Sequence, residues 1–177
     1  MDRLRLATLW LDGCSGCHMS LLDLDDKLVE LAAVVDLVYS PLVDGKVFPE
    51  GVDAALVEGA VSSEEAVSHL RHVRGRTRTL VAFGDCAVTA NVPAMRNQFR
   101  LADVMGRAYE ENADGQVWIP GGAMPRLLEK VFPVHAIVTV DLFLPGCPPS
   151  SKAVLAVLGA LLGGRPLDAA HLSRFGA

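Results

Sequence analysis

The sequence predicts an α/β domain with a doubly wound, mainly parallel sheet of about five strands. Short apolar runs alternate with segments whose apolar residues recur at helical spacing, and turn-forming residues close most of these runs. The hydrophobic fraction of 51% is enough for a core, and 177 residues suit one domain. We therefore expect a single domain over residues 1–177, with a short C-terminal tail over 165–177.

The first half of the chain supplies three expected strands. Leu4 to Leu11 alternates charged and apolar residues and ends in the turn signal Asp12-Gly13. Leucines at helical spacing predict a helix from about Cys17 to Ala33, and Val34 to Tyr39 follows as a short buried strand. Asp53 to Glu58 is the third expected strand. Ser62 or Ser63 is the expected N-cap of the next helix, which runs to about Val73.

The second half continues the alternation. Its expected elements, in order, are a strand over Thr79–Phe83, a short helical stretch that contains Pro93, a long loop over Leu101–Pro120, a short helix over Pro125–Val131, a fifth strand over Ala136–Leu144, and a last helix capped by Ser150 or Ser151 that ends near Gly163-Gly164. Five strands connected in this way fit a flavodoxin-like sheet.

All four cysteines follow expected strands. Cys14 and Cys17 follow the first strand, Cys86 the fourth and Cys147 the last. Right-handed crossovers place the carboxyl ends of parallel strands at one edge of the sheet, where open α/β sheets bind ligands. The sequence therefore predicts that the four thiols meet at that edge.

Four convergent thiolates suit an iron–sulfur cubane or a tetrahedral zinc ion. One Cys-x-x-Cys pair and two isolated cysteines fit a wide [4Fe-4S] cluster, held from three loops, better than a small zinc ion with two paired knuckles. A third interpretation is a thioredoxin-like thiol oxidoreductase, because Cys14-Ser15-Gly16-Cys17 lies between a strand and a helix. That interpretation leaves Cys86 and Cys147 at the same edge unexplained.

Four motifs carry a family resemblance. They are Leu11-Asp12-Gly13-Cys14-Ser15-Gly16-Cys17-His18-Met19-Ser20, Val57-Glu58-Gly59-Ala60-Val61, Gly84-Asp85-Cys86-Ala87 and Leu144-Pro145-Gly146-Cys147-Pro148-Pro149. In this order the chain resembles the small subunits of nickel–iron hydrogenases and the related cluster subunit of complex I. The complex I relative usually has two adjacent cysteines at the first position, so the Cys-x-x-Cys pair here indicates a hydrogenase.

The resemblance implies that Cys14, Cys17, Cys86 and Cys147 bind the proximal [4Fe-4S] cluster, which faces the Ni–Fe centre of a large subunit. Small subunits of the standard uptake enzymes are longer and hold further cysteines. The short chain and the stretch from Tyr39 to Asp44 look most like the bidirectional, NAD-reducing enzymes. In those enzymes the hydrogenase module docks on a diaphorase with flavin and further Fe–S clusters, and the net reaction converts H2 and NAD+ to NADH and a proton. Membrane-bound energy-converting hydrogenases also use short one-cluster subunits and remain an alternative.

Residues beside the cysteines are expected to surround the cluster. Glycines let backbone amides approach sulfur, a proline stiffens the last ligand loop, and a histidine follows the second cysteine. These residues are Gly13, Gly16, His18, Gly84, Gly146 and Pro148. For His18 a partly exposed helix start is the plainer interpretation. Glu58, at the end of the third strand, is a candidate proton relay, or a carboxylate satisfied by nearby amides.

Charge and hydropathy limit the partners. The net charge of −5 without a Lys/Arg run argues against nucleic acid. The longest apolar stretch is too short for a bilayer, and we expect no membrane association and a cytoplasmic location. FMN is not expected in this chain, because the loop that holds phosphate in a flavodoxin carries Cys14 and Cys17. Ni–Fe, FMN and NAD are expected on partner subunits.

Overall fold

The computed structural model describes residues 3–114 and 124–164. Its helices and strands are, in order, β1 (Leu4–Trp10), α1 (Gly16–Leu22), α2 (Asp26–Ala32), β2 (Val35–Tyr39), β3 (Val52–Glu58), β4 (Val61–Ser63), α3 (Glu64–Arg74), β5 (Thr77–Phe83), α4 (Asp85–Thr89), the 3-10 helix η1 (Val92–Gln98), α5 (Leu101–Gly106), the π-helical turn η2 (Arg107–Glu111), β6 (Leu127–Phe132), the 3-10 turn η3 (Val134–Ala136), β7 (Leu142–Leu144) and α6 (Ser151–Gly163). The expected tail over 165–177 lies outside the described residues.

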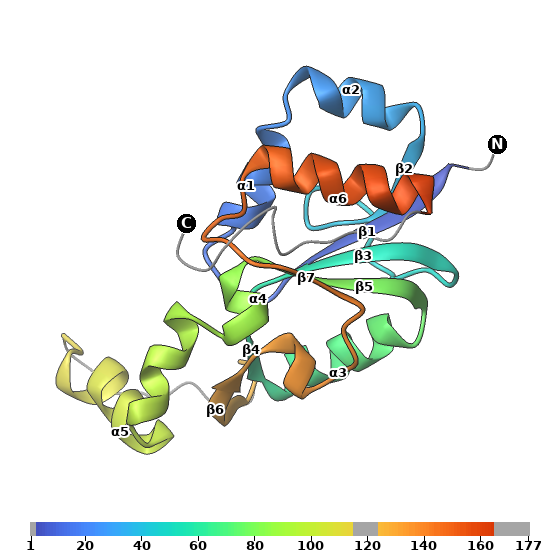
Figure 1. Cartoon of the computed structure of the whole chain (residues 1–177). Coiled ribbons are helices and arrows are strands. Elements are labelled where there is room, and N and C mark those ends of the chain that lie inside the picture. Colours follow the sequence, from blue (N-terminus) through green and yellow to red (C-terminus); the bar gives the residue numbers. More distant parts are fainter. Residues whose placement is uncertain (1–2, 115–123, 165–177) are drawn as a thin grey trace.

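A five-stranded parallel sheet forms the centre of the molecule, in the order β2-β1-β3-β5-β7. Numbered along the sheet strands alone, this order is 2-1-3-4-5, which is the flavodoxin-like order. The predicted fold class is therefore confirmed. α1, α2 and α6 lie on one side of the sheet, and α3 and α4 lie on the other (Figure 1).

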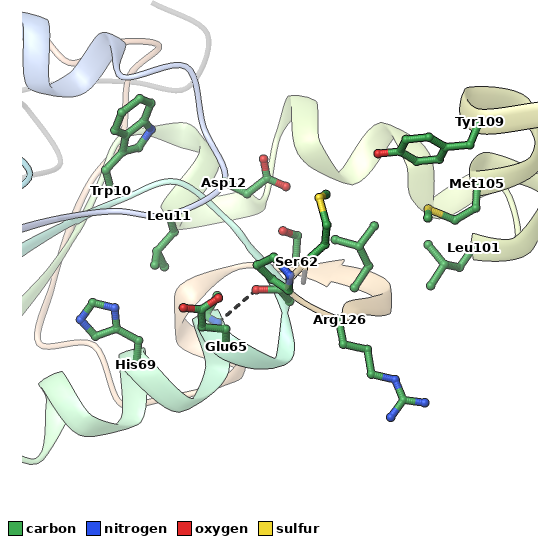
Figure 2. A pocket seen from close by; sticks show the side chains of 15 residues that line it. Trp10, Leu11, Asp12, Ser62, Glu65, His69, Leu101, Met105, Tyr109 and Arg126 are labelled. Atoms are coloured by element: carbon green, nitrogen blue, oxygen red, sulfur yellow. Dashed lines mark hydrogen bonds between the residues drawn. The ribbon is translucent and has the colours of Figure 1, made fainter. Parts of the chain in front are cut away.

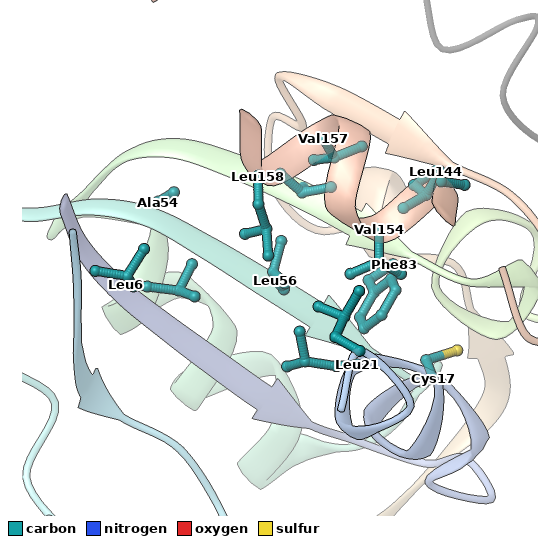
Figure 3. Close-up of a cluster of buried hydrophobic side chains, with 14 of the residues drawn as sticks. Leu6, Cys17, Leu21, Ala54, Leu56, Phe83, Leu144, Val154, Val157 and Leu158 are labelled. Atoms are coloured by element: carbon teal, nitrogen blue, oxygen red, sulfur yellow. The ribbon is translucent and has the colours of Figure 1, made fainter. Parts of the chain in front are cut away.

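The two faces of the sheet carry separate hydrophobic cores, because successive side chains of a strand point to opposite faces. Leu6, Leu56 and Phe83 pack against α1 and α6 (Figure 3). Leu9 and Val57 belong to the opposite core, beneath α3 and α4. Both faces being buried explains why the central strands are nearly continuous apolar runs.

The expected helix over Cys17–Ala33 is in fact two helices. Asp25 has a positive φ of 48°, which ends one helix and begins the next. Leu24 is buried while Asp23, Asp25 and Asp26 are exposed, so the break turns an apolar side chain inward within an acidic segment. The strand expected to be buried over Val34–Tyr39 is also different. β2 is an edge strand, and only one of its five residues is fully buried.

The region between β5 and β7 departs most from expectation. The segment expected to be a helix over Pro125–Val131 is β6, which pairs antiparallel with β4. Side chains distant in sequence hold β6 in place. The Asn97 side chain donates to the Val131 carbonyl and accepts the Val131 N–H, and Arg96 donates to the carbonyls of Ser62 and Leu128. Part of the expected loop over Leu101–Pro120 is helical, as α5 and η2, and residues 115–120 lie outside the described part.

The fifth sheet strand is shorter than the expected Ala136–Leu144. η3 holds the start of that segment in a 3-10 turn. The Asp141 carboxylate then accepts the N–H of Leu80 at 2.7 Å, so the ladder begins only at Leu142. The last helix agrees with expectation: Ser150 caps α6 and Gly164 ends it in the left-handed conformation.

Candidate metal centre

Four free thiols lie at the carboxyl edge of the sheet. Cys14 and Cys17 come from the connection between β1 and α1, Cys86 from the first turn of α4 after β5, and Cys147 from the loop between β7 and α6. Cys17 is buried, Cys86 is half-buried, and Cys14 and Cys147 are exposed. The four thiols therefore come from three connections that are far apart in sequence, and they range from buried to solvent-exposed.

The thiols are close enough to affect one another. Burial raises the pKa of the Cys17 thiol, and the Glu58 carboxylate and the other three thiols raise it further. Burial also raises the pKa of Cys86 to about 11, with Cys147 and Cys14 adding to the shift. Four thiolates are unfavourable here without positive charge among them, and a bound metal supplies that charge.

Within residues 3–114 and 124–164, no three His, Cys, Asp or Glu side chains form a group that could hold a metal ion. The structure brings the four cysteines to one edge of the sheet, and their role as metal ligands stays a prediction.

Gly84 gives the Cys17 sulfur its space. Its φ is +85°, and a Cβ atom at this position would lie 2.2 Å from Sγ of Cys17. Only glycine meets both conditions without strain. Gly16 is also close to the site, since a Cβ there would lie 3.2 Å from Sγ of Cys14 and 3.9 Å from Cβ of Pro148. Gly13 instead faces the turn at Gly59, since a Cβ built at Gly13 would lie 3.2 Å from Cα of Gly59.

Asp85 fastens the loop of Cys147 to the start of α4. Its buried carboxylate accepts the Gly146 N–H at 2.7 Å, and its own N–H donates to the Gly146 carbonyl at 2.9 Å. The Ser20 hydroxyl of α1 donates to the Pro149 carbonyl. The Cys147 loop is therefore tied to both of the other ligand-bearing segments.

Asn91 is a neighbour of the site that sequence reasoning missed. Its side-chain amide lies 3.7 Å from Sγ of Cys147 and donates to it. It follows α4 and has a positive φ of 22°. The only signal in the sequence is a polar residue just after the short Cys86 helix.

His18 does not occupy the partly exposed position expected of it. It is 4% exposed, and its ring contacts the carboxylate of Glu58. Glu58 also accepts the backbone N–H of His18 at 2.9 Å and that of Cys17 at 3.4 Å. The carboxylate is thus satisfied by nearby amides, as one of its two interpretations expected, and it holds the segment that carries Cys17.

An open hollow of about 970 Å³ lies beside this edge. Figure 2 shows Leu101, Met105 and Tyr109 on one side of it, and Trp10, Leu11 and His69 on the other. Its charged lining includes Asp12, Glu65 and Arg126, and the Arg126 guanidinium lies 3.7 Å from Glu64. Both charge signs occur, so the lining does not select an anion or a cation.

Residues 14–161 match the family described as NADH ubiquinone oxidoreductase, 20 kDa subunit. The chain belongs to this family. The match contains all four cysteines, and it confirms the family resemblance read from the motifs around them.

Relatives of the chain include several hydrogenase subunits. The chain is 42% identical over 174 residues to the NAD-reducing hydrogenase HoxS subunit delta of Cupriavidus necator, covering 94% of this chain and 82% of that protein. It is 35% identical over 162 residues to a subunit of the F420-non-reducing hydrogenase vhu of Methanocaldococcus jannaschii, covering 90% of this chain but only 56% of that protein.

Solved structures share the fold of this chain. A chain of an NAD+-reducing [NiFe]-hydrogenase in the H2-reduced state superposes with a TM-score of 0.93 at 41% identity, covering 98% of this chain and 99% of that one. A [NiFeSe]-hydrogenase of Dm. baculatum shares the fold at a TM-score of 0.58 and 19% identity. No helix in the described part of the chain is long and apolar enough to cross a bilayer.

Proposed function

We propose that this chain is the electron-transfer small subunit of an NAD-reducing nickel–iron hydrogenase and that it holds one [4Fe-4S] cluster. One observation carries the proposal: four free thiols gather at the carboxyl edge of the sheet. Its likeness along almost the whole chain to the HoxS delta subunit supports this choice within the family.

The residues present fit a cubane in kind and number. Each iron of a [4Fe-4S] cluster takes one protein thiolate, and this chain has four cysteines, all free. The thiols come from three separate connections, which suits a wide group. Gly84 leaves the Cys17 sulfur room, and the Asn91 amide is placed to donate to the Cys147 sulfur. Hydrogen bonds to cluster sulfurs help set the potential.

The bound cluster would accept and release single electrons. The chain's own residues would hold it in place, exclude water on its buried side and present its open side to a partner. Cys17 is the buried ligand, and Cys14 and Cys147 lie at the exposed rim. We expect the Ni–Fe large subunit to cover that rim and a diaphorase with flavin and further Fe–S clusters to receive the electrons. Glu58 as a proton relay remains a prediction, and no FMN is expected in this chain.

Replacing Cys86 by Ala tests the proposal. Removing one ligand should lose or degrade the cluster, and H2-dependent NAD+ reduction by the purified complex should stop. Iron and acid-labile sulfide, with EPR of the reduced complex, measure the cluster independently of activity. Val29→Ala is the control, because Val29 is 76% exposed on α2 and belongs to none of the segments that carry the thiols.

The alternatives give different results in the same experiment. A C86A complex that keeps full NAD+ reduction with H2 would contradict the proposal. A thioredoxin-like oxidoreductase would depend on Cys14 and Cys17 alone and contain no iron. A structural zinc site would show zinc without sulfide. An energy-converting hydrogenase would co-purify with membrane subunits instead of a diaphorase, and our expected cytoplasmic location would then be wrong.

A further inference from the structure

Four buried polar side chains form a continuous hydrogen-bonded chain behind the Cys14–Cys17 segment. They are Glu58 at the end of β3, His18 in α1, Thr8 in β1 and Ser40 just after β2, and each is at most 4% exposed. His18 Nδ1 contacts Oε2 of Glu58, and Nε2 lies 3.0 Å from the Thr8 hydroxyl. The Thr8 hydroxyl lies 2.7 Å from that of Ser40, which also accepts the Leu42 N–H. The chain thus connects three neighbouring strands to one ligand segment.

Two patterns of donors fit these contacts, because each hydroxyl can both donate and accept and the tautomer of His18 decides the role of Nε2. The Thr8 hydroxyl either accepts from Nε2–H and donates to Ser40, or accepts from Ser40 and donates to Nε2. The contact between Nδ1 and Oε2 then requires a proton between those two atoms. Every member of the chain is satisfied, and His18 is held from both ring nitrogens.

Stability alone is a poor explanation for this arrangement. A buried carboxylate is costly to desolvate, and apolar replacements for buried ion pairs are often neutral or stabilising. What this carboxylate does specifically is accept two consecutive backbone N–H groups, those of Cys17 and His18. These are first-turn amides of α1, which no helical carbonyl satisfies. The position of Cys17 is therefore set by Glu58.

We infer that Glu58 is a positioning residue: with His18, Thr8 and Ser40 behind it, it holds the Cys14–Cys17 segment in the shape that receives the cluster. This inference rests on the proposed function for its ligand. It predicts that the hydrogen-bond acceptor at position 58 matters, and that filling the same volume is not enough.

Two substitutions in the purified complex distinguish a need for the hydrogen-bond acceptor at position 58 from a need for side-chain volume alone. Glu58→Gln keeps a carbonyl that can accept the His18 N–H groups, whereas Glu58→Met fills the space without an acceptor. Thr77→Val is the matched control, because it removes another buried hydroxyl bond, to the Val73 carbonyl, far along β5 from the thiols. The readouts are amide hydrogen exchange of the peptide that contains Cys17 and His18, iron and sulfide content, and the EPR spectrum.

E58M should exchange these amides about tenfold faster than wild type and lose most of its cluster signal, because a buried bond to a charged group is worth about a factor of ten. E58Q and T77V should keep the cluster, with exchange of this peptide within about threefold of wild type. Equal behaviour of E58Q and E58M, or wild-type exchange in E58M, would overturn the inference.

A second variant covers the case in which E58M does not assemble. Thr8→Val keeps the volume of Thr8 and removes the hydrogen-bond partner of His18 Nε2, so it should speed exchange of the same peptide by about threefold. No change in T8V would then overturn the inference. Failure of the proposed function looks different: wild-type complex would lack iron and sulfide, while the exchange contrast between variants would persist.

Discussion

At the residue scale, Gly84 makes the sharpest demand on side-chain identity. Gly84→Ala would place a Cβ 2.2 Å from Sγ of Cys17 in a backbone conformation with φ +85°. Because the neighbour is a buried ligand, we expect the Cys17 sulfur to move and the cluster content to fall by more than half. Iron and sulfide analysis of the purified complex measures this.

Gly159→Ala is the control for Gly84→Ala. Gly159 lies inside α6, and nothing is within 4 Å of a Cβ built there. This substitution should keep the cluster and raise helix stability slightly, by about 0.5–1 kcal/mol. Full cluster content in G84A would show that the sulfur does not need the space that we assign to it.

Among the site residues, the sequence predicted those whose position depends on the strand order alone. Each cysteine follows a strand, so the topology placed all four at one edge. The surroundings of His18 and Asn91 could not be predicted in this way. His18 contacts a residue 40 positions away, and Asn91 a sulfur 56 positions away, through bonds that no local pattern encodes.

At the element scale, Asp141 anchors the last strand to β5. Its carboxylate accepts the Leu80 N–H at 2.7 Å and pairs with the Arg74 guanidinium. Burial alone would raise the pKa of Asp141, but the Leu80 N–H and Arg74 outweigh it and hold that pKa below its ordinary value. The charged form is therefore favoured by folding.

The sign of this shift gives a pH prediction. A carboxyl whose pKa is lowered by folding stabilises the folded state at pH values above its unfolded pKa of about 3.9. This stabilisation is lost as the pH falls through the pKa of the folded state. Asp141→Asn should lower stability by only about 1 kcal/mol near pH 7, since the side chain is 40% exposed and water screens it. The difference in thermal midpoint from wild type should be constant above about pH 5 and shrink below about pH 4.

If the difference in thermal midpoint between wild type and Asp141→Asn grew as the pH was lowered, it would contradict the stabilising role given to the charged Asp141 carboxylate. Asp103→Asn is the control, because Asp103 pairs with Arg100 on the surface at an i,i+3 position and anchors no strand. We expect no measurable change in the midpoint from that variant.

Elements were predictable from sequence where local periodicity and tertiary packing agree. β1, β3, β5, α3 and α6 lie where their apolar patterns place them. Pro125–Val131 was predicted as a short helix because a proline stands at its start, whereas Leu127–Phe132 forms β6, whose state is set by pairing with β4 and by the Asn97 side chain. The break in the first helix likewise depends on burial of Leu24, which no spacing rule identifies.

At the scale of the whole molecule, the domain covers only part of the proposed cluster. Large apolar side chains are exposed within a few residues of the site: Trp10 at 51%, Met19 at 55% and Val92 at 60%. Exposed apolar groups beside a functional site are typical of a surface that a partner covers. We therefore expect the chain expressed alone to lose its cluster to air faster than the complex does, as followed by the decay of its EPR signal. Equal decay would argue against a covering partner.

The central claim is that Cys14, Cys17, Cys86 and Cys147 grip one inorganic cubane. Diffraction from crystals of the complex, collected at the iron and zinc absorption edges, tests it directly. We predict one compact iron peak between the four sulfur atoms, with every one of them bonded to it. A zinc signal without iron, or a disulfide between Cys14 and Cys17 with the other two sulfurs apart, would contradict the account.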